Sequence, residues 1–173
     1  MSGIGDEISS MVKDYRSRLD GAEGYGEVWE IVKDTVKKSL GKHRVGMMLF
    51  LDDLPLRLGA YHPLGTNNIV LNRALVSIVE ATTKSKRLIN AFVYVLLLHE
   101  YLHAIGYVRE SKVRPLVYQL SRESFGEGHV VSQLAKAGPW SLLKDIPLDA
   151  IDVRKQVMEI VKDFEKTGKG YIA

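Results

Sequence analysis

The sequence contains no cysteine among its 173 residues. This absence excludes a disulfide framework and any zinc site that depends on thiolate ligands. Long hydrophobic runs are also missing, because the apolar run 91–98 is far shorter than the about 20 residues that a membrane-spanning helix needs. The first residues, MSGIGDEISS, lack the basic and apolar segments of a signal peptide. We therefore expect a soluble cytoplasmic protein without membrane contact.

No charge of one sign dominates the chain, which carries a formal net charge of +3. Its 46% hydrophobic and 26% charged residues are typical of a globular protein, and its length predicts one domain over residues 1–173. Two groups of basic residues could contact nucleic acid weakly, but neither has the interleaved aromatic residues that stack on bases. They are Lys33, Lys37, Lys38, Lys42 and Arg44, and Lys84, Lys86 and Arg87.

The hydrophobic pattern predicts an α+β fold, with N-terminal helices, a small mixed sheet, a buried helix and C-terminal helices. Apolar residues at helical spacing lie between residues 8 and 19 and between 26 and 40, and GAEGYG separates the two segments. Short strands are predicted at 45–51, 56–61 and 68–71, and further helices at 74–81, 86–106, 113–125, 130–137 and 149–166.

The stretch His99-Glu100-Tyr101-Leu102-His103 is an HExxH motif. Residues four apart lie on the same face of a helix, so both imidazoles can bind one zinc ion. Glu100 is offset around the helix, where it can accept a proton from water whose pKa the metal lowers. The residues before the motif are almost all apolar, which predicts a buried helix in which unpartnered histidines would be costly.

This motif resembles the active-site helix of the zincin metallopeptidases. LGAYHPLGTNNIVLNRAL, at residues 58–75, is similar to the edge strand and turn beside the substrate cleft of small zincins. Among these, SprT-like proteases and minigluzincins are nearest in size and element order, and the resemblance covers about residues 45–137. It implies a zincin-like domain that binds Zn²⁺ and hydrolyses a peptide or protein substrate.

The third zinc ligand is open, because a catalytic zinc normally has three protein ligands. Arg109 stands at the last position of the metzincin pattern HExxHxxGxxH and cannot bind zinc. His129, in FGEGH, resembles the third histidine of SprT-like proteins, and it is our first candidate. Glu123 has a spacing similar to that of thermolysin-like gluzincins, and it is our second. Glu127 and Glu110 are further alternatives.

We therefore expect a zinc metallopeptidase in which His99 and His103 bind the metal, His129 or Glu123 completes the site, and Glu100 is the general base. The alternative is a catalytically silent zincin-fold module that binds nucleic acid or a protein partner. A third possibility is a latent peptidase whose cleft is covered by helix 149–166 and the tail TGKGYIA. The sequence specifies neither the substrate nor the oligomeric state.

Overall fold

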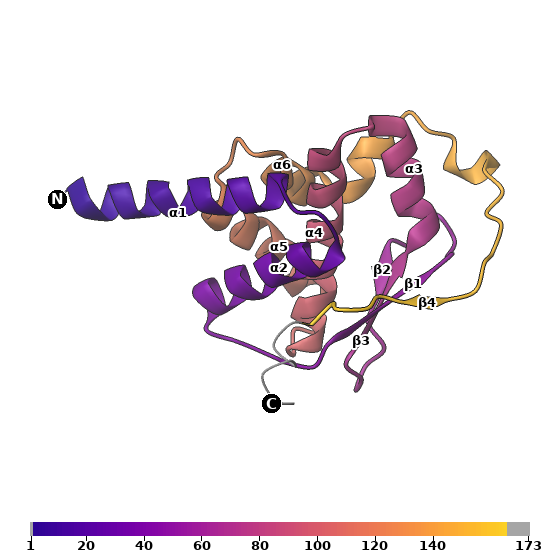
Figure 1. Cartoon of the computed structure of the whole chain (residues 1–173), viewed down its shortest axis with the longest axis horizontal. Coiled ribbons are helices and arrows are strands. Elements are labelled where there is room, and N and C mark those ends of the chain that lie inside the picture. The colour runs from indigo at the N-terminus through magenta and orange to yellow at the C-terminus, as the bar shows by residue number, and fades with distance from the viewer. Residues whose placement is uncertain (1, 166–173) are drawn as a thin grey trace.

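The computed structural model describes residues 2–165 and has the predicted α+β organisation (Figure 1). Its α-helices are α1 (Ser2–Asp20), α2 (Tyr25–Leu40), α3 (Arg73–Thr83), α4 (Lys86–Ala104), α5 (Glu110–Phe125) and α6 (Val130–Ala137). Its strands are β1 (Met48–Asp52), β2 (Ala60–Tyr61), β3 (Asn68–Asn72) and β4 (Glu159–Ile160), and two 3-10 helices span Pro139–Leu143 (η1) and Leu148–Ala150 (η2). No helix within residues 2–165 is long and apolar enough to cross a membrane.

The four strands form a mixed sheet in the order β2-β3-β1-β4. β1 and β3 are parallel, while β2 and β4 run antiparallel to their neighbours and form the two edges. β1 and β3 are mostly buried, and β2 and β4 are only two residues long. The sheet therefore has two short edge strands, which limits unwanted pairing with other chains.

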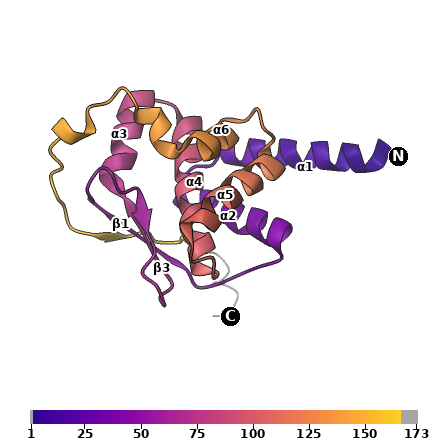
Figure 2. The same cartoon turned by 180° about the vertical axis from the view of Figure 1, so that it is seen from behind.

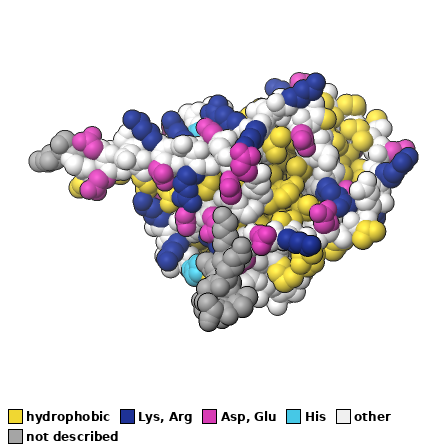
Figure 3. Space-filling view, in the orientation of Figure 1, with side chains coloured by type: hydrophobic (Ala, Val, Ile, Leu, Met, Phe, Trp, Pro, Cys, Tyr) yellow, Lys and Arg dark blue, Asp and Glu magenta, His cyan; other side chains and the backbone are white. Residues whose placement is uncertain are grey.

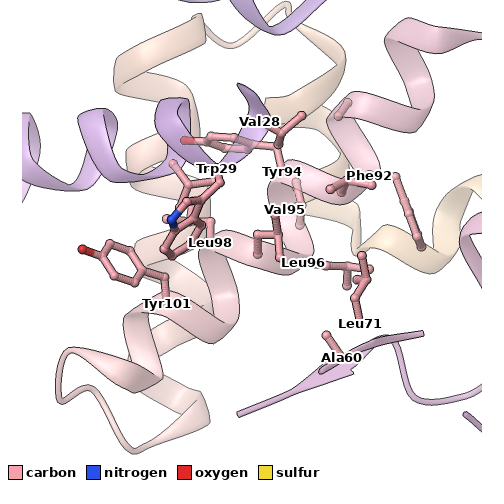
Figure 4. Packing of buried hydrophobic residues seen from close by; sticks show 14 of the residues in the cluster. Val28, Trp29, Ala60, Leu71, Phe92, Tyr94, Val95, Leu96, Leu98 and Tyr101 are labelled. Atoms are coloured by element: carbon pink, nitrogen blue, oxygen red, sulfur yellow. The ribbon is translucent and has the colours of Figure 1, made fainter. Parts of the chain in front are cut away.

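Helix α4 is the centre of the hydrophobic core. Its residues from Asn90 to Leu98 are all buried, as the continuous apolar run predicts. In Figure 4, Leu96 extends toward Ala60 and Leu71 of the sheet, while Trp29 and Tyr101 lie at the other side of the helix. Seen from behind, α5 and α6 lie alongside α4 (Figure 2). The motif helix is thus held by the sheet and by several helices.

A buried asparagine shapes the segment between β1 and β2. The Asn72 side chain donates to the carbonyls of Leu54, Pro55 and Leu58, and its oxygen accepts from the Leu54 amide. These bonds fold residues 54–58 into a compact turn and leave a shorter strand than the predicted 56–61. The turn then passes directly into edge strand β2, so Asn72 positions this edge of the sheet.

The predicted helix 149–166 is wrong over its described part. After η2 the chain is extended, and β4 pairs with the outer edge of β1. Phe164 is buried and stacks on Trp29, with ring centroids 4.7 Å apart. The helical spacing of the apolar residues is overridden because pairing with β1 and packing on Trp29 stabilise the extended form.

Candidate metal centre

The motif histidines lie near the C-terminal end of α4, where the chain reverses direction into α5. The turn at residues 105–109 contains Gly106 with a φ of 117°, a value that residues other than glycine rarely adopt. The Tyr107 amide donates to the carbonyl of Leu102, which closes the turn against the helix. α5 then begins with Glu110, whose negative charge is favourable at a helix N-terminus. The turn brings Glu110 back to the two histidines.

Three potential metal ligands converge here: His99, His103 and Glu110. Nε2 of His103 lies 2.6 Å from Oε1 of Glu110, and Nε2 of His99 lies 3.0 Å from Oε2. One ligand atom from each residue lies within 4.8 Å of the others. In residues 2–165 no other group of three histidine, cysteine, aspartate or glutamate side chains meets this criterion.

The hydrogen bond on the far side of His103 determines how its ring faces Glu110. Nδ1 lies 2.7 Å from the carbonyl oxygen of Tyr107, which can only accept, so Nδ1 must donate. In neutral His103, Nε2 is therefore an unprotonated acceptor that faces a carboxylate oxygen. Two acceptors at this distance need a proton or a metal ion between them. A backbone carbonyl on the opposite ring nitrogen is also a common feature of metal-binding histidines.

The protonation tendencies of the site favour metal binding. Burial lowers the pKa of His99 despite its contact with Glu110, and neutral imidazole is the form that binds metals. Partial burial tends to raise the pKa of Glu110, but hydrogen bonds and charge interactions with both histidines outweigh it and hold that pKa below its usual value. At neutral pH the site thus presents a neutral His99 beside an ionised carboxylate.

Glu100 has the environment of a proton acceptor. Its side chain is only 7% exposed, and this burial raises its pKa to about 7, although His103 lowers it and Glu110 raises it further. Glu100 is not part of the three-ligand group, but it lines the same cleft as His99 and Glu110. The structure therefore separates Glu100 from the ligand set, as the spacing of the motif predicts.

His129, our first candidate for the third ligand, lies elsewhere. It is buried at the start of α6, where Nδ1 accepts from the Val131 amide and Nε2 lies 3.1 Å from Oδ1 of Asp20. Both ring nitrogens are therefore engaged, and His129 is not brought to the motif histidines. The physical reason is local, because a side chain that caps a helix must turn back toward its own backbone.

The glutamate alternatives differ in position. Glu123 lies exposed near the end of α5 and accepts a hydrogen bond from Gln119 one turn earlier. Glu127 is exposed in the turn between α5 and α6. Neither belongs to the three-ligand group, whereas Glu110, which we placed with Glu127 behind His129 and Glu123, does. Its helix-start position directly after a glycine turn was the signal that could have identified it.

The site opens into a cleft of about 690 Å³. Its lining comes from the turn and edge strand between Arg57 and Ala60, from α4 and α5, and from the end of α6 with the segment after it. At Gly59 a Cβ atom would lie only 2.8 Å from Leu96 and 3.0 Å from Trp140, so the edge packs closely on both. The other residues of the lining are Val95, His99, Glu100, Glu110, Arg114, Pro115, Val117, Tyr118, Ala135, Lys136, Ala137, Gly138 and Pro139.

The C-terminal segment does not cover this cleft in the described residues. Trp140, whose indole donates to the carbonyl of Leu56, is the last described residue of the cleft lining, and beyond it the chain contacts this lining where Asp149 accepts from Arg57. It then reaches the opposite edge of the sheet, where β4 pairs with β1 (Figure 1). Residues 149–165 therefore do not close the site as a latent peptidase would require, and the tail TGKGYIA lies outside the described residues.

The two basic groups are partly occupied within the protein. Lys33 is buried and pairs with Glu30 and Glu165, while Arg44 donates to the carbonyls of Thr66 and Ala104. On the face in Figure 3, Lys and Arg side chains alternate with Asp and Glu. This face therefore does not offer the continuous basic surface that nucleic-acid phosphates favour.

Comparisons of the chain with models of protein families, with curated proteins and with solved structures found no match.

Proposed function

We propose that this protein is a zinc-dependent peptidase with a zincin-like active site. His99, His103 and Glu110 would hold the metal, and Glu100 would act as the general base. The observation that carries this proposal is the convergence of both motif histidines on one carboxylate at the wall of a cleft. In this proposal Glu110 is the third ligand, the role that we expected of His129 or Glu123.

The donor set fits zinc. Two imidazole nitrogens and one carboxylate oxygen form the His₂Glu combination that occurs in zinc peptidases. In a tetrahedral site with ligands about 2.0–2.1 Å from zinc, neighbouring ligand atoms are about 3.3 Å apart. Oε1 of Glu110 lies 2.6 Å from Nε2 of His103 and 3.2 Å from Nε2 of His99, so these separations would have to widen only slightly. Glu110 can provide this movement because its side chain is 55% exposed at a helix start.

Zinc bound here would polarise a peptide carbonyl and lower the pKa of water. The residues of the chain would transfer the protons and orient the metal-binding imidazole. Glu100 would take a proton from the attacking water and later deliver it to the leaving amine, which a pKa of about 7 suits in both directions. The Tyr107 carbonyl would hold His103 in the orientation in which Nε2 faces the site.

The edge of the sheet supports a peptide as the substrate. β2 lies at the edge of the sheet, and the segment Arg57–Ala60 lines the same cleft as the motif helix, with Gly59 packed on Leu96 of that helix. An extended peptide can bind to such an edge through its backbone and so place one bond beside the metal. This arrangement also supports the zincin-like architecture that the motif suggests.

The test combines metal analysis with hydrolysis. Protein purified without added zinc should contain close to one equivalent of metal by mass spectrometry. Glu100→Gln should retain the metal and lose hydrolysis of a quenched-fluorescence peptide mixture by about 10²–10⁴-fold. Glu123→Gln, an exposed glutamate on α5, is the matched control and should change neither measurement. Metal-free wild type, or full activity in Glu100→Gln, would contradict the proposal.

A further inference from the structure

We infer that the cleft selects peptides that carry a carboxylate close to the scissile bond. This inference deepens the proposed function and rests on it, because it assumes that a peptide occupies the cleft. It follows from the charged residues of the lining. The positive charges are those of Arg57, Arg114 and Lys136, and the negative charges are those of Glu100 and Glu110. Both carboxylates already have roles at the metal centre, so the cations are the groups left for the substrate.

The three cations belong to different elements. Arg57 lies in the turn before β2, Arg114 on α5, and Lys136 near the end of α6. They therefore surround the cleft and do not form one stripe on a single helix. Together they place three positive charges in one concave site, where charges attract an anionic group more effectively than isolated surface charges do.

Arg114 is the cation nearest the metal centre. It lies one helical turn after Glu110, and its Nε is 3.8 Å from Oε2 of that residue. Tyr118 follows one turn later and also lines the cleft, so this face of α5 looks toward the substrate space. The Arg114 side chain is 80% exposed, which leaves its guanidinium able to form a bidentate contact with a carboxylate.

Arg57 and Lys136 complete the rim. Arg57 donates to both oxygens of Asp149, at 3.3 and 3.0 Å, but both side chains are highly exposed. Such exposed pairs are weak, so a substrate carboxylate can compete for Arg57. Lys136 is exposed, and none of the ion pairs found among residues 2–165 involves it. Between these cations the lining is largely apolar, with Val95, Leu96 and Trp140.

The carboxylate could come from an acidic side chain or from the C-terminus of a short peptide. The test uses matched octapeptides in which glutamate, glutamine or lysine flanks a central leucine. Each peptide is made with a free and with an amidated C-terminus, which separates the two sources of the carboxylate. Binding is measured by calorimetry on zinc-loaded Glu100→Gln protein, so that no peptide is cleaved. A repeat on metal-free protein shows whether the preference needs the metal.

Among the peptides with an amidated C-terminus, the glutamate peptide should bind about fivefold more tightly than the glutamine peptide, and the lysine peptide should bind more weakly than both. If the terminal carboxylate is the recognised group, the free-acid glutamine peptide should show the same gain over its amide. Arg114→Gln should reduce the preference, and the triple variant R57Q/R114Q/K136Q should remove it. Lys112→Gln, an exposed cation on the same helix but outside the cleft lining, should leave the preference unchanged.

Equal binding of all peptides, or an unchanged preference in the triple variant, would overturn the inference. These results are independent of catalysis, because the ratio of dissociation constants is measured without hydrolysis. If wild type binds metal and cleaves peptides but shows no preference, only the inference about carboxylates fails. If the preference is present while wild type neither binds metal nor cleaves peptides, the proposed peptidase function fails by itself.

Discussion

Two histidine–carboxylate contacts in this molecule look alike but have different surroundings. In one, His103 faces Glu110 at the wall of a cleft, and in the other, His129 faces Asp20 between α6 and α1. The distances are similar, at 2.6 and 3.1 Å. The difference lies in what else converges: His99 reaches the same carboxylate as His103, whereas His129 uses its second nitrogen to cap α6.

This difference distinguishes a cluster of three potential metal ligands at a cleft from a contact that lies inside the fold. His129 is only 3% exposed, and its ring lies against Phe125, with centroids 5.3 Å apart. Glu110, by contrast, is half exposed and can adjust to a metal. A histidine next to a carboxylate is therefore weak evidence for a metal site until the second ring nitrogen and the solvent access are known.

The largest effect should appear when one carboxylate is removed from each contact. Glu110→Ala should weaken zinc binding by at least about a hundredfold, because it removes one of the three proposed ligands. Asp20→Ala should leave zinc affinity unchanged. Both affinities can be measured on metal-free protein by competition with a chromophoric chelator. The opposite result would make His129 the third ligand and would require α6 to move toward the motif.

A smaller effect is expected for stability when the cap is lost. His129→Ala should lower the free energy of unfolding by about 2 kcal/mol, because the α6 cap and a buried contact disappear. His129→Asn should lose about half as much, since an asparagine oxygen can accept from the helix N-terminus. Urea unfolding of the metal-free proteins measures both changes. If Ala and Asn are equally stable, capping is not the role of this side chain.

The smallest effect should be the pH dependence of that stability. Burial lowers the pKa of His129 below its usual value of 6.5, although Asp20 opposes the shift. The unfolded chain therefore binds a proton at higher pH than the folded protein, so this contribution to stability is complete above pH 6.5 and declines as pH falls below it.

His99 in the metal-free protein shares this direction of shift, so the comparison must isolate His129. Urea unfolding at pH 8 and pH 5.5 should show a larger loss of stability on acidification for wild type than for His129→Asn. An equal loss in the two proteins would mean that His129 contributes nothing to the pH dependence.

The helical part of the fold was largely predictable from local patterns. The helices predicted at 86–106, 113–125 and 130–137 correspond to α4, α5 and α6, because their apolar residues recur at helical spacing and glycines mark their ends. The same spacing failed at 149–166, where the preference of a short segment was weaker than its pairing with β1. The role of Asn72 in the turn at 54–58 gave no sequence signal, since it depends on four carbonyl and amide groups that only folding brings near.

The sequence by itself determined the two histidines and the glutamate of HExxH, because their relative positions depend only on the geometry of one helix. It could not determine the third member of the group. That choice depended on a turn through Gly106 that directs Glu110 toward the pair, and on a cap that directs His129 away from it. Both are contacts between separate elements, so only the tertiary structure decided which acid joins the histidines.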